Sequence, residues 1–548
     1  MLPIDSPECL SLGDSLPPGD PHAVSVCLPK WADSVGWVTK EPRVVDAMRT
    51  GYPRFFIPRA VERLAVIIMQ CHASNGGATN TNTEDDQFLV LPSRRYATLA
   101  HRFLYDEHQE GTSDSITTLR VRWNGLVRVT DAPGSDGDGP PCGTEDIFIV
   151  SFPKELLLAA KAFWQHTGFG ISSRRATFWS ECAPILSESH SSTSLQNDAA
   201  TARAELQARM ASGHSSEGFQ VNPRDVFLYP TGMAAITEAA IAVQSVQNQT
   251  PRVVAVFGFL YVDTFKTLSR ILGYSTTVYN YHPGEIDKLE AALTNGNLTL
   301  SALFTEFPGN PLLQSPYLSR LHTLSTQHNF LLIVDDTLSS YPNVSLLPEC
   351  DLICTSLTKL FSGKSNVMGG SVIISPTSRY SSHLHAVLTD NHDPATWFPS
   401  DVITMERNSR DFPARAHRAS FTADKLVSLL RAHPAVEEVY YPKGSPTQDI
   451  YAQHRRPNGG WGHILSIRFK EASKAVVFHD GLDVAKGPSL GTNFTLASPY
   501  AVLAHWGERE WAAGYGVVEH LVRISVGLEG EEWVLGRVKR ALEEVEAA

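Results

Sequence analysis

The stretch CTSLTKLFSGKSNVMGGSVIIS, residues 354–375, decides the fold class of this chain together with FLLIVDD at residues 330–336. Both contain short apolar runs with the length and composition of strands buried on both faces of a parallel sheet. One run leads to Lys359, which follows two hydroxyl side chains, and the other ends at Asp335. Because ligands bind at the carboxyl ends of such strands, we expect these polar groups to share one edge of a sheet.

This combination indicates pyridoxal phosphate (PLP) chemistry. A PLP enzyme needs a lysine that forms a Schiff base with the cofactor and an acid that binds the ring nitrogen, and Lys359 and Asp335 fit these roles. The hydroxyls of Ser356 and Thr358 can reach the cofactor phosphate, whereas Asp336 would point to the opposite face of its strand. Taken alone, SLTK fits a solvated surface lysine equally well. The hypothesis therefore depends on the rest of the chain.

Composition describes a large globular chain of several domains. Its 548 residues exceed one ordinary domain, and 42% apolar with 19% charged residues is typical of a globular protein. The net charge of -12 argues against nucleic acids and anionic membranes as partners. No apolar run is long enough to span a membrane. The seven scattered cysteines include no C-x-x-C pair, which predicts neither disulfides nor a metal site and favours a cytoplasmic location.

The chain divides into four predicted regions. Residues 1–150 are expected to form an N-terminal α+β extension without a recognisable chemical motif, and residues 151–223 an arm or linker. In residues 224–411, short apolar runs alternate with helical patterns, which predicts an α/β domain with a mainly parallel sheet covered on both faces. Residues 412–548 are expected to form a smaller α+β domain. The strands predicted in the large domain are 253–258, 275–280, 298–306, 330–336, 351–356 and 369–375.

Two elements are predicted within the extension. SRRYATLAHRFLYDEH, residues 93–108, has a helical pattern. LRVRWNGLVRVT, residues 119–130, predicts a β-hairpin with Asn124 and Gly125 at its turn.

A phosphate site is predicted in the segment YPTGMAAI, residues 229–236, which runs into a strong helix former. Gly232 would begin a helix and expose unpaired backbone N–H groups at the positive end of the helix dipole, where a phosphate binds well. The alternative interpretation is an ordinary helix N-cap at Thr231.

Four further residues are candidates for binding the ring and the substrate. Tyr261 follows the strand 253–258 and can stack on a cofactor ring, although a core aromatic is the ordinary fate of such a tyrosine. Asn310 can donate to the cofactor or to a substrate carboxylate, or can form an Asn-Pro turn. Arg523 interrupts an apolar strand pattern, where a bidentate clamp on an α-carboxylate would explain it. Ser489 can add a further donor.

In their order along the chain these motifs resemble those of the Cys/Met-metabolism family of PLP enzymes, which includes cystathionine γ-synthases, cystathionine lyases and homoserine sulfhydrylases. The resemblance covers roughly residues 160–548 and implies the type I PLP fold. The segments that carry it are YPTGMAAI, YVDT, EFPGNP, VDDT, SLTK, SLGTNFTLASP and VRISVGLE. The N-terminal extension resembles that of fungal cystathionine γ-synthases.

The resemblance assigns roles to individual residues. It implies that Lys359 is the Schiff-base lysine and proton shuttle, that Asp335 binds the ring nitrogen and that Tyr261 covers the ring. It also implies that Arg523 holds the substrate carboxylate. The residues implied at the phosphate are Gly232, Met233, Ser356 and Thr358.

The chain departs from the family pattern at three places. The family has a Y-x-R motif on an arm that reaches the neighbouring subunit; here GFGISSRRATFW, residues 168–179, offers Arg174 but no tyrosine. The motif Y-G-G-T has become YVDT, with Asp263 in place of a glycine. Phe494 replaces a glutamate. We expect these changes to border the substrate, which leaves its identity open.

The resemblance implies γ-replacement on an O-acyl-homoserine, acetyl or succinyl. Lys359 would remove the α-proton, the acyloxy group would leave Cγ, and cysteine would add there to give cystathionine. The alternatives are sulfide as the acceptor, a carbon nucleophile such as a β-keto acid enolate in secondary metabolism, and a non-catalytic PLP binder. The family's shared active sites imply a homodimer or a dimer of dimers.

Overall fold

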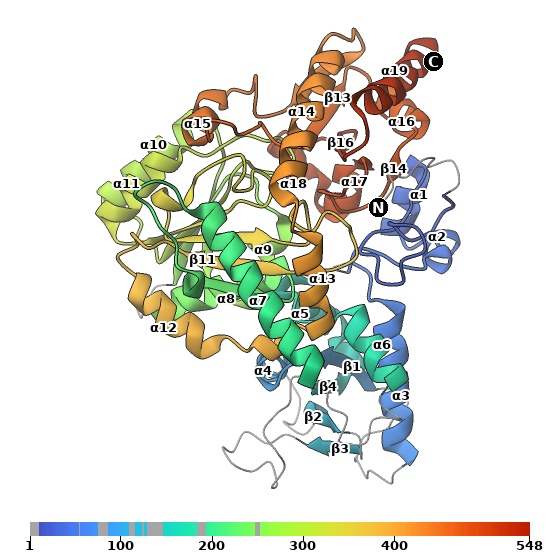
Figure 1. The fold of residues 1–548 in the computed structure, drawn as a ribbon, viewed down its shortest axis with the longest axis vertical. Coiled ribbons are helices and arrows are strands. Elements are labelled where there is room, and N and C mark those ends of the chain that lie inside the picture. The colour runs from blue at the N-terminus through green and yellow to red at the C-terminus, as the bar shows by residue number, and fades with distance from the viewer. Residues whose placement is uncertain are drawn as a thin grey trace.

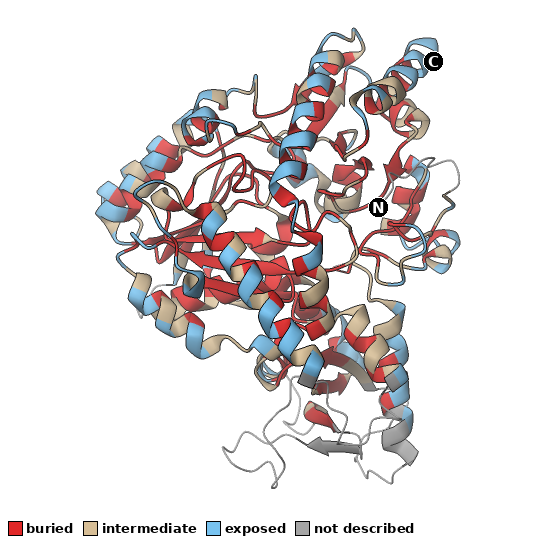
Figure 2. Ribbon diagram, in the orientation of Figure 1, coloured by how far each residue is buried: buried red, intermediate tan, exposed pale blue. Residues whose placement is uncertain are grey.

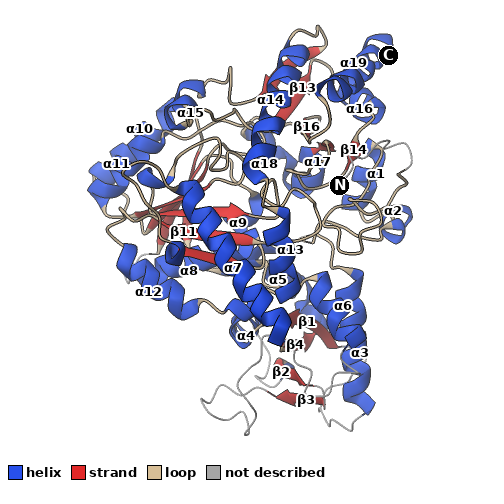
Figure 3. Cartoon of the chain, viewed as in Figure 1, coloured by secondary structure: helices blue, strands red, loops and turns tan. Residues whose placement is uncertain are grey.

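The computed structural model describes residues 10–53, 55–74, 86–108, 115–122, 125–128, 146–182, 193–246 and 252–548. Its largest sheet has seven strands in the order β5-β11-β10-β9-β8-β6-β7. Strand β11 of this sheet is labelled in Figures 1 and 3. The strands are β5 (Val226–Tyr229), β6 (Val253–Phe257), β7 (Ser275–Tyr279), β8 (Ala302–Glu306), β9 (Leu331–Asp335), β10 (Leu352–Ser356) and β11 (Gly370–Ile374). Strands β6 to β10 pair in parallel, and β11 is antiparallel to both of its neighbours. All six predicted strands are present; β5 was missed because four residues are too few to show a period.

Helices cover both faces of this sheet (Figure 1). Val254 and Val256 on β6 belong to the same buried cluster as α8 and α12, whereas Ala255 and Phe257 belong to the cluster with α7, α10 and α11. Both side-chain directions of the strand are therefore apolar, as in a parallel sheet buried on both faces. The helices of this domain are α7 (Thr193–His214), α8 (Gly232–Val246), α9 (Val262–Lys266), α10 (Pro283–Thr294), α11 (Leu318–His328), α12 (Ser381–Asn391) and α13 (Pro399–Asn408). No helix in the described ranges has the length and apolar character needed to cross a membrane.

The C-terminal domain is built on a second sheet, in the order β12-β13-β16-β15-β14. Its strands are β12 (Val436–Tyr440), β13 (Ile464–Phe469), β14 (Ala485–Lys486), β15 (Leu496–Pro499) and β16 (Val522–Ser525). Leu465, Ile467 and Ile524 pack with α14, α16 and α19 into one core. The helices are α14 (Phe412–Arg431), α15 (Gln448–His454), α16 (Ala472–Gly481), α17 (Tyr500–His505), α18 (Arg509–Gly514) and α19 (Glu531–Ala547).

The N-terminal extension contains an antiparallel sheet in the order β1-β4-β2-β3. The expected helix over 93–108 is α4, and the expected hairpin is β2 and β3; Asn124 at its turn lies outside the described residues. The elements are α3 (Arg59–Ser74), β1 (Asp86–Leu91), α4 (Arg94–Glu107), β2 (Thr117–Arg122), β3 (Gly125–Arg128) and β4 (Ile147–Pro153). Helices α5 (Leu157–Thr167) and α6 (Ser173–Cys182) belong to residues 151–223 but pack with α4 and α3, so they form part of the extension.

The extension shares a core with the large domain. Tyr96 on α4 stacks on Phe169 with ring centroids 3.7 Å apart, and both belong to the buried cluster that contains Met233 on α8. Arg95 forms an ion pair with Glu238 on α8, with Nη2 2.9 Å from Oε2, and the Glu238 side chain is 0% exposed. The extension is therefore held against the helix that was predicted to bind phosphate.

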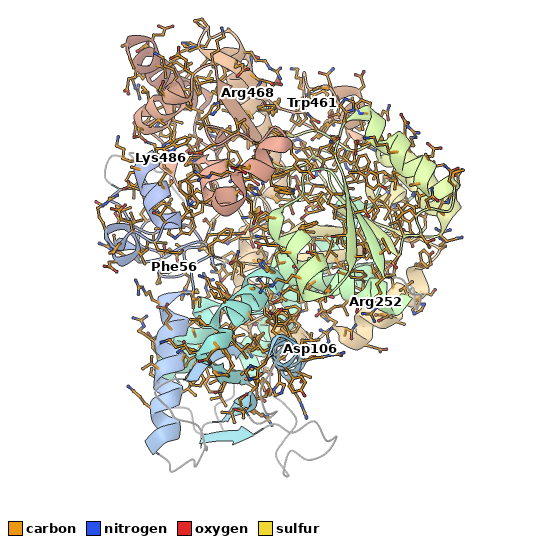
Figure 4. The ribbon with its side chains drawn as sticks, turned by 180° about the vertical axis from the view of Figure 1, so that it is seen from behind. Phe56, Asp106, Arg252, Trp461, Arg468 and Lys486 are labelled. Carbon is orange, nitrogen blue, oxygen red and sulfur yellow. The ribbon has the colours of Figure 1, made fainter. Side chains whose placement is uncertain are left out.

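Residues 10–53, which include α1 (Trp31–Val38) and α2 (Pro42–Ala47), lie against the C-terminal domain (Figures 1 and 4). The backbone N–H of Leu28 donates to the carbonyl of Lys486 at 2.9 Å, and that of Trp31 donates to Asp480 Oδ1 at 2.7 Å. Buried residues lie along this contact and in the sheets of the large and C-terminal domains, while the outer faces of the helices are exposed (Figure 2). Residues 10–53 thus pack onto the C-terminal domain, far from them in sequence.

We expect Arg95→Leu to destabilise the protein strongly. The variant leaves the buried Glu238 carboxylate without its cation, a change that typically costs about 3–5 kcal/mol. Urea unfolding followed by tryptophan fluorescence measures this. Arg102→Leu, at an exposed position on the same helix, is the control and should leave the midpoint unchanged. Equal midpoints for the two variants would contradict the prediction.

Candidate active site

Three neighbouring strand ends bring acidic and hydroxyl side chains together. Glu306 at the end of β8 lies opposite Asp335 at the end of β9, and Ser356 ends the next strand, β10. All three line one pocket, and the shared edge that the strand pattern predicted for Asp335 and Ser356 is present. Asp336 is turned away from it and accepts a hydrogen bond from Thr355 Oγ1 at 2.5 Å. The opposite orientations of the two aspartates are confirmed.

Lys359 lies in this pocket between two hydroxyl groups. Its Nζ donates to Ser489 Oγ and to Tyr52 Oη, both at 3.0 Å, and lies 4.2 Å from the centre of the Tyr52 ring. The residue is only 8% exposed. A lysine that is buried among hydroxyls is not the solvated surface residue of the alternative interpretation.

Tyr52 is a pocket residue that the sequence analysis missed. It comes from the N-terminal segment, and Trp37 and Phe55 from the same segment line the pocket beside it. The Phe55 ring lies 5.6 Å from that of Tyr52 and 6.1 Å from that of Trp37. The order Tyr52-Pro53-Arg54 has the spacing of a Y-x-R motif, and this signal would have identified Tyr52. Arg54 lies outside the described residues.

Arg174, the arginine selected from the sequence, lies elsewhere in this chain. Its Nη1 donates to Asp401 Oδ1 at 2.9 Å. It lines a separate cavity together with His22 and Asn366, not the pocket that contains Lys359. Within a single chain, the structure does not bring Arg174 to the other candidate residues.

The start of α8 forms a cradle that fits a phosphate. A Cβ atom added to Gly232 would lie 2.7 Å from Cβ of Ser356, so only glycine permits this close approach. Thr231 Oγ1 accepts from the N–H of Ala234 at 2.9 Å, which makes Thr231 the N-cap as well. The helix N-terminus directs its dipole toward the pocket. The candidate phosphate residues Gly232, Met233, Ser356 and Thr358 all line the pocket that contains Lys359.

Asp335 is suited to bind a cationic ring nitrogen. Its Oδ1 accepts from the N–H of Thr337 at 2.9 Å. Burial raises the pKa of Asp335, while hydrogen bonds from Thr337 and the charge of Lys359 lower it. Burial, followed by the charge of Asp335, also raises the pKa of Glu306. A buried carboxylate beside a second acid is stabilised by an added cation, so a pyridinium N–H fits here.

Tyr261 lines the pocket at the start of α9. Its backbone N–H donates to Glu306 Oε1 at 2.5 Å. Asp263 and Phe494, two departures from the family pattern, were expected to border the substrate, but neither residue lines this pocket. Phe494 packs instead in an apolar cluster with Leu16. The expectation that these two changes border the substrate space is therefore wrong.

The candidate substrate residues meet around one arginine. Arg523 on β16 is 6% exposed; its Nη2 donates to the carbonyl of Ser489 at 2.7 Å and its Nη1 to Asn310 Oδ1 at 3.2 Å. Its guanidinium lies 4.7 Å from the centre of the Tyr500 ring. Burial lowers the pKa of Arg523. These partners of the buried cation, all within the described ranges, are neutral groups, so it is ready to bind a carboxylate.

Comparisons with known proteins agree with this geometry. The family described as "Cys/Met metabolism PLP-dependent enzyme" matches residues 209–543, and "Fungal trans-sulfuration enzyme, N-terminal domain" matches residues 60–172. The chain is 34% identical to a cystathionine γ-synthase of Neurospora crassa, over 98% of both chains. It is 31% identical to an alanine racemase of Aspergillus violaceofuscus, over 98% of this chain and 97% of that one.

The fold has solved counterparts. A cystathionine γ-synthase from Xanthomonas oryzae, crystallised with aminoacrylate and cysteine, matches with a TM-score of 0.55 and 24% identity over 64% of this chain and 88% of that one. The type I PLP fold expected from the sequence is confirmed. The family match extends from before Gly232 at the start of α8 to beyond Arg523, and the pocket that both residues line fits the cofactor. The chain therefore belongs to the Cys/Met-metabolism family of PLP-dependent enzymes.

Proposed function

We propose that this enzyme catalyses γ-replacement on an O-acyl-L-homoserine, with L-cysteine as the acceptor and cystathionine as the product. The acyl group would be acetyl or succinyl, and the enzyme would act in the cytoplasm as a homodimer or a dimer of dimers. The similarity to the Neurospora crassa enzyme along the whole chain supports this choice of reaction.

The observation that carries the proposal is the double role of Ser489. Its hydroxyl accepts a hydrogen bond from Lys359, and its backbone carbonyl accepts one from Arg523. Ser489 adopts a positive φ of 92°, an uncommon backbone conformation for a residue other than glycine. The base and the carboxylate clamp are thereby joined through one residue. An amino acid held by Arg523 would present its Cα to the amine of Lys359.

The chain's own residues would then move the protons. Bound PLP supplies an electron sink that stabilises negative charge at Cα. Lys359 would take the proton from Cα and give it up before it takes a second proton from Cβ, after which the acyloxy group leaves Cγ as a carboxylate and a thiolate adds there. Protons would then return to Cβ and, through Lys359, to Cα, so the product keeps its hydrogen atoms at both carbons. Hydrogen bonds from Nζ to Tyr52 and Ser489 hold the amine in the pocket between these steps.

Other acceptors use the same base and clamp. Sulfide would give homocysteine, and a stabilised carbon nucleophile would form a carbon–carbon bond. A second candidate reaction is alanine racemisation, because a relative with that name matches nearly the whole chain. Racemisation requires a proton donor on each face of Cα. The Tyr52 hydroxyl next to Lys359 is a second candidate acid in the same pocket.

Lys359→Ala should abolish turnover. Because general acid–base catalysis alone typically contributes about 10²–10⁴-fold, we expect at least a 1000-fold loss in acyl-group release from O-acetylhomoserine. Borohydride reduction should also no longer fix the cofactor to the chain. Lys364→Ala, a partly exposed lysine nearby, is the control and should behave as the wild type. Retained turnover in Lys359→Ala would exclude this lysine as the base.

Arg523→Lys should raise KM for O-acetylhomoserine. Lysine keeps the charge but loses the fork that binds a carboxylate with two hydrogen bonds, which we expect to raise KM about 10- to 100-fold. Steady-state kinetics across substrate concentrations measure the effect. Arg468→Lys, on neighbouring strand β13 and paired with exposed Glu437, should leave KM unchanged. An unaltered KM in Arg523→Lys would place the carboxylate elsewhere.

A comparison of acceptors tests the reaction itself. O-acetylhomoserine is supplied with cysteine, sulfide or acetoacetate, and L-alanine is supplied alone; products are separated by chiral chromatography and identified by mass spectrometry. We expect cystathionine to form fastest. Absence of product with cysteine would reject cysteine as the acceptor, and D-alanine as the only product would replace γ-replacement by racemisation.

A further inference from the structure

The end of helix α5 connects the N-terminal extension to two parts of the cofactor site. This turn consists of His166, Thr167 and Gly168. One side of it contacts the segment that carries Tyr261, and the other contacts the start of α8. Both contacts are made by buried groups, so they constrain the geometry of the site.

The first contact joins His166 to Asp263. His166 Nδ1 lies 2.7 Å from Asp263 Oδ1, and the Asp263 side chain is 0% exposed. Gln165 Nε2 donates to the same oxygen at 3.3 Å. Asp263 lies in the first turn of α9, two residues after Tyr261. A buried carboxylate requires partners, so this helix start is tied to α5.

The backbone of His166 strengthens the same contact. Its carbonyl accepts a hydrogen bond from Thr267 Oγ1 at 2.7 Å, in the helical turn that follows α9. Within α9, the N–H of Thr264 donates to the carbonyl of Tyr261 at 2.9 Å. Side chain and backbone of His166 therefore fix both ends of the short helix that begins at Tyr261.

The second contact joins Gly168 to the N-cap of α8. Thr231 Oγ1 donates to the Gly168 carbonyl at 3.1 Å. Gly168 has φ +69°, and a Cβ atom there would lie 2.3 Å from Thr231 Oγ1. Thr237 Oγ1 also donates to the Thr167 carbonyl at 3.4 Å. The same turn thus holds the phosphate cradle and the helix of Tyr261 in one arrangement.

We propose that His166 is a positioning residue, which through Asp263 sets Tyr261 over the PLP ring, and that the N-terminal extension thereby forms part of the cofactor site. This inference rests on the assignment of PLP and on the role proposed for Tyr261, and is independent of the acceptor. It accounts for the change of Y-G-G-T to YVDT, because Asp263 is the residue that His166 binds. The glycine of the family pattern could not make this contact.

The test replaces His166 and observes the cofactor directly. In His166→Ala, the start of α9 loses its side-chain contact with α5, and a misplacement of Tyr261 by about 1 Å can cost about 100-fold in rate. We expect the visible circular dichroism of bound PLP to change and the PLP dissociation constant to rise about tenfold, as is typical when a residue that orients a binding residue is removed. We also expect kcat to fall about 100-fold with little change in KM. Titration of the apoenzyme with PLP gives the affinity.

Two variants separate positioning from stability. In His166→Asn the amide can donate to Asp263 in place of the imidazole, so the dichroism and kcat should largely recover. The double variant His166→Ala/Asp263→Ala removes the buried carboxylate that has lost its imidazole partner, so its thermal stability should recover while the dichroism stays altered. Lys161→Ala, on the exposed face of α5, is the control and should match the wild type.

The outcomes distinguish this inference from the proposed function. If His166→Ala lowers only the melting temperature, with dichroism, PLP affinity and kcat within about twofold of the wild type, the residue is structural and the proposal is overturned. A double variant with normal dichroism overturns it as well. If the wild type binds PLP normally but yields no γ-replacement product, the proposed reaction fails while the dichroism series still decides the role of His166.

Discussion

In a sheet that is buried on both faces, charged side chains are tolerated best at the ends of the strands. This constraint determines where the polar groups of the site lie. The apolar strands β8, β9 and β10 admit polar side chains at their ends, where Glu306, Asp335 and Ser356 meet. Burial and the neighbouring charge of Asp335 raise the pKa of Glu306. A positive charge placed beside these two acids would therefore be stabilised. Lys359 supplies one such charge, and a protonated cofactor ring fits as a second.

The part of the site that sequence could predict is the part carried by local pattern. Each of the six strands had a run long enough to recognise; Asp335 and Ser356 lie at the ends of two such runs, and Lys359 follows the second closely. Gly232 was recognisable because a glycine that begins a helix has a limited set of uses. Arg523 was recognisable because an arginine in an apolar strand needs a partner or a ligand. In these cases the physical reason for the residue lies within a few positions of it.

The remaining features depend on contacts between distant segments. Tyr52 reaches Lys359 across 307 residues of chain, and His166 reaches Asp263 across 97. The hydrophobic periodicity of a sequence predicts local elements and does not reveal contacts between such distant segments. Asp263 was expected beside the substrate because it follows Tyr261 closely, but the chain turns into a helix between them and the carboxylate faces α5 instead. Proximity in sequence was a poor guide here because a helix begins directly after Tyr261.

The position of the N-terminal segment has a consequence for biosynthesis. Trp37, Tyr52 and Phe55 form one wall of the pocket, yet the segment that carries them rests on strands and helices near the other end of the chain. On the ribosome the first residues emerge first, and domains generally fold in that order. The segment that carries this wall gains its contacts with Asp480 and Lys486 only after these residues have been synthesised. Incomplete chains released early would therefore hold the lysine without its aromatic cover.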